Sequence, residues 1–162
     1  MATTLTPVCF TGPLTLQGGA QYRSCVLRMS AEIHHEMIAH AHAGLPLEAC
    51  GLFAGSVGTD EDATVARFYP TENEAASSKV YTVPGKAFLR ADRDAEDAGW
   101  QLLGVMHSHT HTEAYPSPTD VRQAPDEAWH YVIVSMRDDI PSLRSYRIIG
   151  GEIHEEPVEL IG

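Results

Sequence analysis

The sequence GVMHSHTHTEAYPSPTD, residues 104–120, decides the fold more than any other stretch. Residues 102–106 form an apolar run of the kind that makes a buried strand, and His107 and His109 follow directly. Alternate residues of a strand point to the same face of a sheet, so both imidazoles leave one face, as two ligands of one metal must. A helix would turn these two side chains apart. We therefore expect a strand that ends in a pair of metal ligands.

The end of the same stretch predicts the start of a helix. Ser117 is a favoured N-cap residue, Pro118 is favoured at the first helical position, and Asp120 lies in the first turn. The carboxylate of Asp120 can therefore point back toward the two histidines. Two imidazoles and one carboxylate suit zinc and leave a fourth position for water, which is the arrangement of a catalytic rather than a structural site.

The remaining chain alternates between predicted strands and two long helices. Ser30 can cap a helix whose apolar residues recur at helical spacing as far as Gly44, and Pro84 begins a second amphipathic helix that ends at Gly99. Short apolar or alternating runs predict strands at residues 25–29, 50–54, 65–69, 80–83, 102–106, 131–135, 143–149 and 152–160. A Gly-Gly pair at 150–151 predicts a hairpin between the last two. These patterns indicate the α/β class, loosely α+β, with a mixed sheet flanked by helices.

Length and composition limit the architecture and the partners. The 162 residues suit one domain; residues 1–21, rich in Thr, Pro and Gly, are expected to form an N-terminal extension and residues 22–162 the folded domain. The 22 acidic and 11 basic side chains give a formal charge of −11, which disfavours nucleic acid and anionic membrane surfaces as partners. Neither a membrane-spanning run nor a basic signal segment is evident, so we expect a cytoplasmic protein.

Hydrolysis at such a metal also requires a general base, and two acidic residues are candidates. Glu48 stands just before the buried run at residues 50–54 and is the acidic residue best placed by sequence to enter the same pocket. Glu113, between the histidines and Asp120, is its local rival. The position of Glu48 beside a buried strand favours it as the base.

Other polar residues near these positions are given structural interpretations. His111 could share the face of the ligand pair, but a fourth protein ligand would close the catalytic position, so we do not expect it to bind metal. Cys50 has no basic neighbour that would lower its pKa and is expected to be a packed, inert thiol. With Cys9 and Cys25 it completes a set of three cysteines without a CxxC pair, which predicts reduced thiols. Asn73 is either a turn residue or a side chain that orients the substrate backbone.

The pattern of Glu48, His107-x-His109, Ser117 and Asp120 resembles the JAMM/MPN+ zinc metallopeptidase motif, and no position of the motif is missing. The resemblance implies the MPN fold, a mixed sheet between helices whose architecture is related to that of cytidine deaminases. It also implies that both histidines and Asp120 bind one Zn²⁺. By the same resemblance, Glu48 activates the water and Ser117 hydrogen-bonds the developing oxyanion.

The resemblance covers the chain from about residue 22 onward and is strongest to a bacterial branch of the family. The stretches that carry it include EACG at 48–51, HSHT at 107–110, TEAYPS at 112–117 and RSYRI at 144–148. Thr110 stands where many members of the family have proline, as it does in that branch. Characterised members of the branch hydrolyse the bond between a ubiquitin-like sulfur-carrier protein and cysteine. The resemblance thus implies a role in cysteine biosynthesis, with a carrier whose tail ends in Gly-Gly as the partner.

Three other functions compete with this one. A general JAMM isopeptidase, or deubiquitinase-like protease, would use the same site, although the chain lacks the insertions of the eukaryotic deubiquitinating relatives. A zinc deaminase shares the architecture but needs His/Cys/Cys ligation and a Pro-Cys-x-x-Cys element, which the sequence does not contain. A non-catalytic MPN scaffold usually loses metal ligands, whereas this chain retains all of them.

Overall fold

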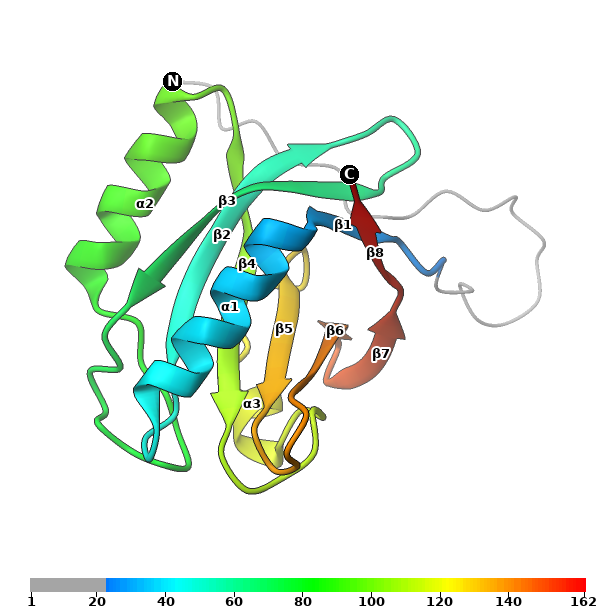
Figure 1. The fold of residues 1–162 in the computed structure, drawn as a ribbon. Coiled ribbons are helices and arrows are strands. Elements are labelled where there is room, and N and C mark those ends of the chain that lie inside the picture. The colour runs from blue at the N-terminus through cyan, green and yellow to red at the C-terminus, as the bar shows by residue number, and fades with distance from the viewer. Residues whose placement is uncertain (1–22) are drawn as a thin grey trace.

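Within residues 23–162, which the computed structural model describes, one eight-stranded sheet forms the centre and three helices pack on it (Figure 1). In chain order the elements are β1 (Leu27–Ser30), α1 (Ala31–Gly44), β2 (Cys50–Val57), β3 (Ala63–Thr71), α2 (Gly85–Asp97), β4 (Gln101–His109), α3 (Pro118–Gln123), β5 (His130–Ser135), β6 (Ser142–Ile149), β7 (Glu152–Glu156) and β8 (Val158–Ile161). The extension predicted at residues 1–21 lies outside the described residues and stays a prediction.

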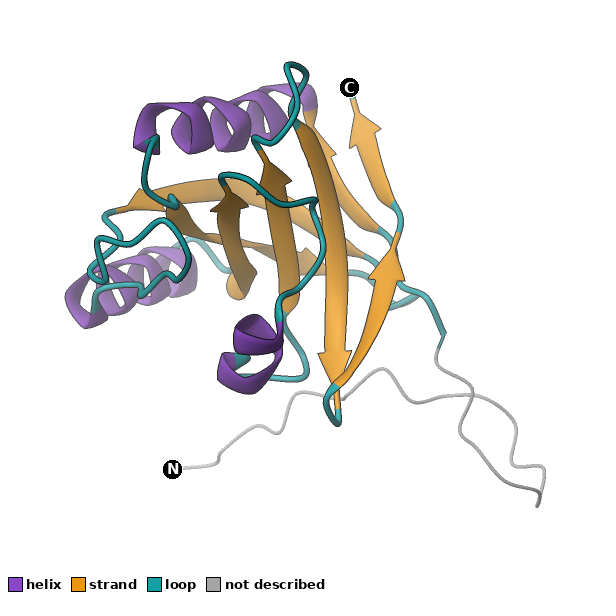
Figure 2. Cartoon of the chain, turned by 90° about the horizontal axis from the view of Figure 1, so that it is seen from below, coloured by secondary structure: helices purple, strands orange, loops and turns teal. Residues whose placement is uncertain are grey.

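The sheet is mixed, as the sequence predicts, and it curves strongly. Its strand order is β7-β6-β5-β4-β2-β3-β1-β8, in which β4/β5, β1/β3 and β1/β8 are parallel and the other neighbours are antiparallel. Although β7 and β8 lie at opposite ends of this order, only Pro157 separates them in the chain. The two edges therefore approach each other at this residue, where the N–H of Leu27 donates to the carbonyl of Pro157 at 2.9 Å (Figure 2).

Each face of the sheet carries its own hydrophobic core under helices. Ile33, Met37 and Ala41 of α1 belong to the core of one face, whereas Ala91 of α2 and Val121 of α3 belong to the core of the other. Figure 2 shows α1 on one side of the sheet and α2 and α3 on the opposite side. With α1 the longest at 14 residues, none of the helices between residues 23 and 162 has the length and apolar composition to cross a membrane.

Local sequence signals set the helix ends where they were expected. The hydroxyl oxygen of Ser30 accepts a hydrogen bond from the N–H of Ile33 at 3.2 Å, which satisfies one of the free donors at the start of α1. This helix ends at Gly44. α2 follows Pro84, and Gly99, with a φ of +76°, lies just beyond its last turn.

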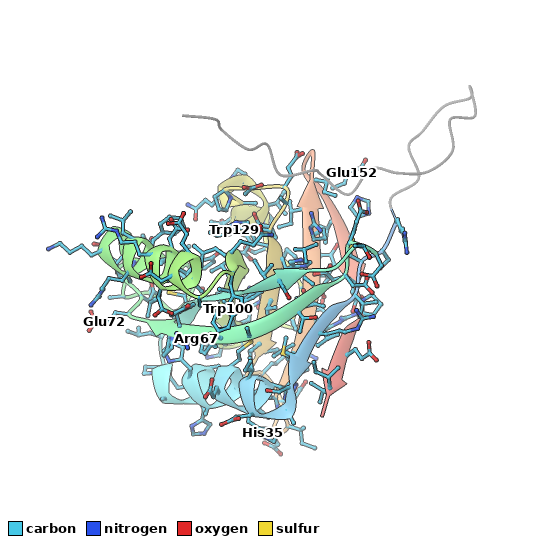
Figure 3. The ribbon with its side chains drawn as sticks, turned by 90° about the horizontal axis from the view of Figure 1, so that it is seen from above. His35, Arg67, Glu72, Trp100, Trp129 and Glu152 are labelled. Atoms are coloured by element: carbon cyan, nitrogen blue, oxygen red, sulfur yellow. The ribbon has the colours of Figure 1, made fainter. Side chains whose placement is uncertain are left out.

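Side chains of β3 attach α2 to the sheet. The guanidinium of Arg67 forms an ion pair with Asp94 of α2 and lies 5.2 Å from the centre of the Trp100 ring (Figure 3). The hydroxyl of Tyr69 donates to the same carboxylate at 2.6 Å. These contacts are half exposed and contribute little by themselves, so the attachment of α2 depends mainly on its buried alanine face.

Two of the predicted strands are wrong in detail. Residues 80–83 form a loop instead of a strand: the side chain of Asn73 bonds the carbonyl of Val80 and the N–H of Thr82, and the N–H of Glu74 donates to the carbonyl of Thr82. Residues 152–160 form two strands, β7 and β8, that belong to opposite edges of the sheet. Pro157 separates them, since proline has no N–H for a strand ladder.

Candidate metal centre

The candidate site lies at the end of β4, a strand near the middle of the sheet between β2 and β5. His107 pairs with Ile133 across β4 and β5, and Ile133 belongs to the core beneath α2 and α3, so the site lies on that face. His109, two residues further along β4, points the same way. The two histidines are 1% and 4% exposed, which confirms the predicted burial of a strand that ends in both imidazoles.

Asp120 reaches the two histidines from the first turn of α3. Ser117 is the N-cap: its hydroxyl oxygen accepts from the N–H of Asp120 at 3.2 Å. In return, Oδ2 of Asp120 accepts from the N–H of Ser117 at 2.7 Å, which completes a capping box. The cap thereby fixes the carboxylate at the start of a short helix, where the helix dipole also favours a negative charge.

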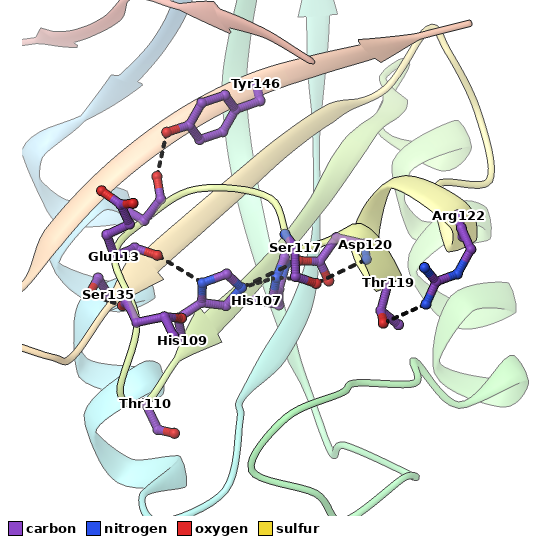
Figure 4. Close-up of polar contacts among 12 residues, drawn as sticks. His107, His109, Thr110, Glu113, Ser117, Thr119, Asp120, Arg122, Ser135 and Tyr146 are labelled. Atoms are coloured by element: carbon purple, nitrogen blue, oxygen red, sulfur yellow. Dashed lines mark hydrogen bonds and ion pairs between the residues drawn. The ribbon is translucent and has the colours of Figure 1, made fainter. Parts of the chain in front are cut away.

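The three side chains converge on one point (Figure 4). The Nε2 atoms of His107 and His109 are 3.1 Å apart, and they lie 3.4 Å and 3.3 Å from the two carboxylate oxygens of Asp120. A tetrahedral zinc ion with bonds of about 2.0 Å separates its ligand atoms by about 3.3 Å. Donor type, number and spacing therefore fit zinc, and these three residues form the one such metal-competent group within residues 23–162.

The protonation states of Asp120 and His107 suit metal binding, whereas a metal would have to compete with a proton for His109. Burial by itself would raise the pKa of Asp120, but hydrogen bonds with His107 and His109 outweigh it and hold that pKa well below its ordinary value. Burial lowers the pKa of His107, so its imidazole is neutral. For His109, burial is outweighed by contacts with Asp120 and with the carbonyl of Glu113, which raise its pKa. An ionised carboxylate and a neutral imidazole are the forms that bind a metal.

Glu48 lies beside this group without belonging to it. Its side chain is 5% exposed, and its Oε2 atom is buried without a hydrogen-bond partner within the described part of the chain. Burial raises the pKa of Glu48 to about 7, with the charge of His109 opposing the shift and that of Asp120 adding to it. The structure therefore brings Glu48 to the site as an unpaired carboxyl group, in a state suited to proton transfer near neutral pH.

The loop between β3 and α2 covers the site, and the sequence patterns did not point to it. The ring of Tyr81 stacks on the imidazole of His107, with centroids 4.4 Å apart and an interplanar angle of 19°. Asn73 organises this loop: its Nδ2 donates to the carbonyls of Glu48 and Val80, both at 3.0 Å, and its Oδ1 accepts from N–H groups of the loop. The amide of Asn73 is thus occupied within the protein and acts as a turn residue.

The remaining candidates lie at the edge of the site. Glu113 is exposed, and its contribution to the site is its backbone carbonyl, which accepts from Nδ1 of His109 at 2.8 Å. His111 is exposed, bonds to Thr110 Oγ1 at 2.7 Å and is not part of the converging group. Cys50 lies opposite His107 on β2, and burial raises the pKa of its thiol, in line with an unreactive cysteine.

Comparison with known proteins agrees with this geometry. Residues 30–149 match the family described as prokaryotic homologues of the JAB domain. A CysO-cysteine peptidase of Mycobacterium tuberculosis is 41% identical over 149 residues, which cover 91% of this chain and 98% of that protein. A desampylase of Haloferax volcanii is 32% identical over 115 residues, which cover 67% of this chain and 80% of that protein.

Solved structures include proteins with the same fold. The solution structure of a Desulfitobacterium hafniense protein superposes with a TM-score of 0.77 at 35% identity, covering 83% of this chain and 92% of that one. The match over residues 30–149 spans most of the chain, from the start of α1 to the end of β6. Family model, sequence relatives and fold agree, and the chain belongs to the prokaryotic homologues of the JAB domain.

Proposed function

We propose that this protein is a zinc-dependent peptidase that cleaves the amide bond between the C-terminus of a ubiquitin-like sulfur-carrier protein and cysteine. The observation that carries the proposal is the convergence of three ligand atoms, with the unpaired buried carboxyl group of Glu48 beside them. The 41% identical relative is named a CysO-cysteine peptidase, which supports both the hydrolytic activity and the class of substrate. Such a reaction would release cysteine and so contribute to its biosynthesis.

His107, His109 and Asp120 would hold the zinc ion, and they leave a further position for water or substrate. When bound, zinc supplies a Lewis acid that polarises the scissile carbonyl and lowers the pKa of water. The carbonyl of Glu113 keeps the proton of His109 on Nδ1, so that Nε2 presents its lone pair to the metal. The capping box fixes the carboxylate of Asp120 through the N–H of Ser117, so this ligand is also held by a bond outside the metal site.

Glu48 would act as the general base and then as the general acid. Its carboxylate takes a proton from the attacking water and returns it to the nitrogen of the leaving amine, so the net proton count on the side chain is unchanged. A pKa of about 7 suits both transfers, because the group gives up and regains a proton with similar ease near neutral pH. The lack of any other partner on Oε2 leaves this oxygen available for the proton.

Ser117 would stabilise the negative charge that develops on the substrate oxygen. Its hydroxyl oxygen is already fixed by the N–H of Asp120, which leaves the hydroxyl proton to be donated. A donor that is held in place by a helix cap costs little reorganisation when the charge appears. In this role the same hydrogen bond that begins α3 also orients the donor.

The carrier's tail would bind in extended form beside residues 80–83. The main-chain groups of Thr82 are used inside the loop by Asn73 and Glu74. The adjacent N–H and C=O groups of Tyr81 and Val83 have no hydrogen-bond partner within residues 23–162 and can pair with an added strand. Because Tyr81 stacks on His107, a tail bound here ends at the metal centre, and glycines would fit most easily where it enters.

A general isopeptidase that separates such a carrier from a lysine side chain is the second candidate. It rests on the relative named a desampylase, which is 32% identical over two thirds of this chain. The two candidates share every residue of the site and differ only in the leaving amine. The metal chemistry of the site within residues 23–162 therefore does not distinguish cysteine from lysine as the leaving amine.

The decisive experiment offers the purified protein matched substrates and measures the products by intact mass. The substrates are a carrier–cysteine adduct and the same carrier linked to lysine, each with the native tail and with valine replacing the penultimate glycine, together with an unfolded peptide. We expect zinc-dependent release of cysteine from the native adduct, slower cleavage of the lysine conjugate, and a block by valine. Equal cleavage of unfolded peptides would refute the carrier, and a metal-free folded protein without activity would support a scaffold.

A further inference from the structure

The loop that follows β4, residues 110–116, has three consecutive backbone carbonyls that each accept a hydrogen bond from a buried side chain on a different strand (Figure 4). The donors are Ser135 Oγ to the Thr112 carbonyl at 2.6 Å, His109 Nδ1 to the Glu113 carbonyl at 2.8 Å, and Tyr146 Oη to the Ala114 carbonyl. The middle bond belongs to a candidate metal ligand. The two outer bonds tie the loop to β5 and β6.

The middle bond decides how the imidazole of His109 is presented. The carbonyl of Glu113, 2.8 Å from Nδ1, and Oδ2 of Asp120, 3.3 Å from Nε2, can both only accept, so they compete for the single proton of the neutral ring. The shorter bond to the carbonyl favours the proton on Nδ1, which leaves the lone pair on Nε2, facing His107 and Asp120. The carbonyl also fixes the plane of the ring. Any displacement of the Glu113 carbonyl therefore alters both the tautomer and the direction of the ligand's lone pair.

Apart from a hydrogen bond from the N–H of Tyr115 at 2.8 Å, which lies within the loop itself, the Glu113 carbonyl is held in place through its neighbours. Residues 111–113 and 115 are exposed, so this part of the loop has little core packing of its own. Ala114 is the exception: it is 2% exposed and packs in the core that contains Tyr146. The outer bonds flank the Glu113 carbonyl by one residue on each side and thereby anchor to the sheet the loop in which it lies.

The two outer donors stand on rigid parts of the sheet. Ser135 is the register partner of His109 on β5 and is 3% exposed, so it holds the loop from the strand beside the ligand itself. The N–H of Met136 also donates to the carbonyl of His109 at 2.8 Å. Tyr146 on β6 is fully buried, and its ring is fixed by the core around it. Both hydroxyls are therefore placed by strands of the sheet, although the ring of Tyr115 in the loop also packs on Tyr146 with centroids 5.6 Å apart.

We propose that Ser135 and Tyr146 are positioning residues of the metal centre, which act by holding the loop carbonyl that orients His109. Neither side chain touches the ligand atoms. The zinc-binding part of this inference rests on the proposed function, whereas the effect on the His109 tautomer is a property of the protein without metal.

The test uses Ser135→Ala, Tyr146→Phe and the double variant, with Tyr131→Phe as the matched control. Tyr131 is 2% exposed on the same face, and its hydroxyl donates at 2.6 Å to the carbonyl of Asp126, which lies outside the loop at residues 110–116. The control thus removes the same kind of bond, a buried tyrosine hydroxyl to a loop carbonyl. Each substitution removes only the hydroxyl group and keeps the rest of the side chain.

Three measurements are made on each protein. Imidazole nitrogen NMR of the metal-free protein at alkaline pH gives the tautomer of His109, competition with a chelator gives the zinc affinity, and thermal unfolding gives the stability. We expect the wild type and Tyr131→Phe to show His109 protonated at Nδ1. The double variant should show a mixture of tautomers and bind zinc about 10–100-fold more weakly, with each single variant intermediate.

The deciding result is whether a variant changes the His109 tautomer and the zinc affinity beyond its effect on the unfolding temperature. If Ser135→Ala or Tyr146→Phe lowers the unfolding temperature as Tyr131→Phe does but leaves tautomer and zinc affinity unchanged, the two residues are structural and the proposal is overturned. If the double variant does not fold, the single variants decide by the same criteria. If the wild type hydrolyses no carrier adduct, the proposed function fails, yet the tautomer comparison still stands.

Discussion

Within residues 23–162, two buried clusters of histidine and carboxylate lie on opposite faces of the sheet, and only one of them has the converging ligand atoms of a candidate metal centre. In the first, the Nε2 atoms of His107 and His109 converge with the oxygens of Asp120. In the second, Nδ1 of His130 lies 2.6 Å from Oε1 of Glu156. Both clusters join strands in the interior, and both contain imidazole and carboxylate at hydrogen-bond distance.

The two clusters differ in whether their nitrogen and oxygen atoms can form hydrogen bonds with each other. Ser145 Oγ donates to the same Oε1 that contacts His130, so one oxygen satisfies both groups, while Oε2 of Glu156 is buried without a hydrogen-bond partner within residues 23–162. In the first cluster the facing nitrogens cannot satisfy each other when both are lone pairs, and a cation between them removes the conflict. Composition and burial are thus alike in the two places, and the direction of the lone pairs separates a metal centre from a structural bond.

The most severe test exchanges one histidine from each cluster for alanine. His109→Ala should abolish zinc binding and hydrolysis, because alanine supplies no ligand atom and only two of the three ligand residues remain. His130→Ala should bind one zinc per chain and lose stability only. Metal analysis and an activity assay of both variants decide the point, and full zinc occupancy in His109→Ala would remove this residue from the ligand set.

The next largest effect concerns Glu48, whose carboxyl group lies beside the first cluster and is not one of its three ligand residues. Glu48→Gln should retain zinc and lower kcat by a factor of ~10²–10⁴, since proton transfer is lost while the shape of the side chain is kept. Glu113→Gln is the control, because the exposed carboxylate of Glu113 is not at the site and only its backbone carbonyl contacts His109. The opposite result, normal turnover in Glu48→Gln and a loss in Glu113→Gln, would reverse the two assignments.

Ser117→Ala should have a smaller effect on turnover than the base variant. Loss of one oxyanion donor costs about 10²–10³ in kcat, and loss of an N-cap costs about 1 kcal/mol of stability. Ser30→Ala separates the two effects, because Ser30 caps α1 with a bond of the same 3.2 Å length and lies outside the converging group. If both variants lose stability equally and neither loses turnover, Ser117 is a cap only.

The sequence predicts the parts of this comparison that depend on local patterns. Strand alternation places His107 and His109 on one face, and the Ser117-Pro118 cap places Asp120, because both signals act within a few residues. Similar local signals predict the starts of α1 and α2. The position of Glu48 just before the buried run at residues 50–54 also predicts its approach to the site, which depends on β2 lying beside β4, and the family resemblance assigns it the same role.

The sequence could not predict contacts that are made across the fold. Residues 80–83 have strand-like composition, but the amide of Asn73 bonds the carbonyl of Val80 and the N–H of Thr82, and no pattern in the chain shows these contacts. Tyr81 on His107, and the hydroxyls of Ser135 and Tyr146 on the loop carbonyls, likewise join residues that are far apart in sequence. Pro157 is different, since a proline within a predicted strand is itself a signal of a break.

The unpaired state of Glu48 also predicts how the stability of the metal-free protein depends on pH. The pKa of Glu48 is raised to about 7 from an ordinary value of 4.5, so between these pH values the folded state binds more protons than the unfolded state. Stability should therefore fall as pH rises through this range. Glu48→Gln lacks this contribution, and above about pH 7 the metal-free variant should be more stable by on the order of 3 kcal/mol. Urea unfolding in a chelator across this range measures the difference, and parallel curves for the two proteins would contradict it.

The smallest expected effect is in the second cluster and concerns stability alone. Glu156→Ala leaves Nδ1 of His130 and Oγ of Ser145 without their shared acceptor, which should lower the free energy of unfolding by about 1–3 kcal/mol. Glu156→Gln should lower it less, because an amide oxygen can still accept from both donors. Zinc affinity should be the same in both variants as in the wild type, since the cluster lies on the face of the sheet away from the metal ligands. A loss of zinc affinity in Glu156→Ala that matches its loss of stability would show that the two faces are coupled through β5, and the separation of the two clusters would then be wrong.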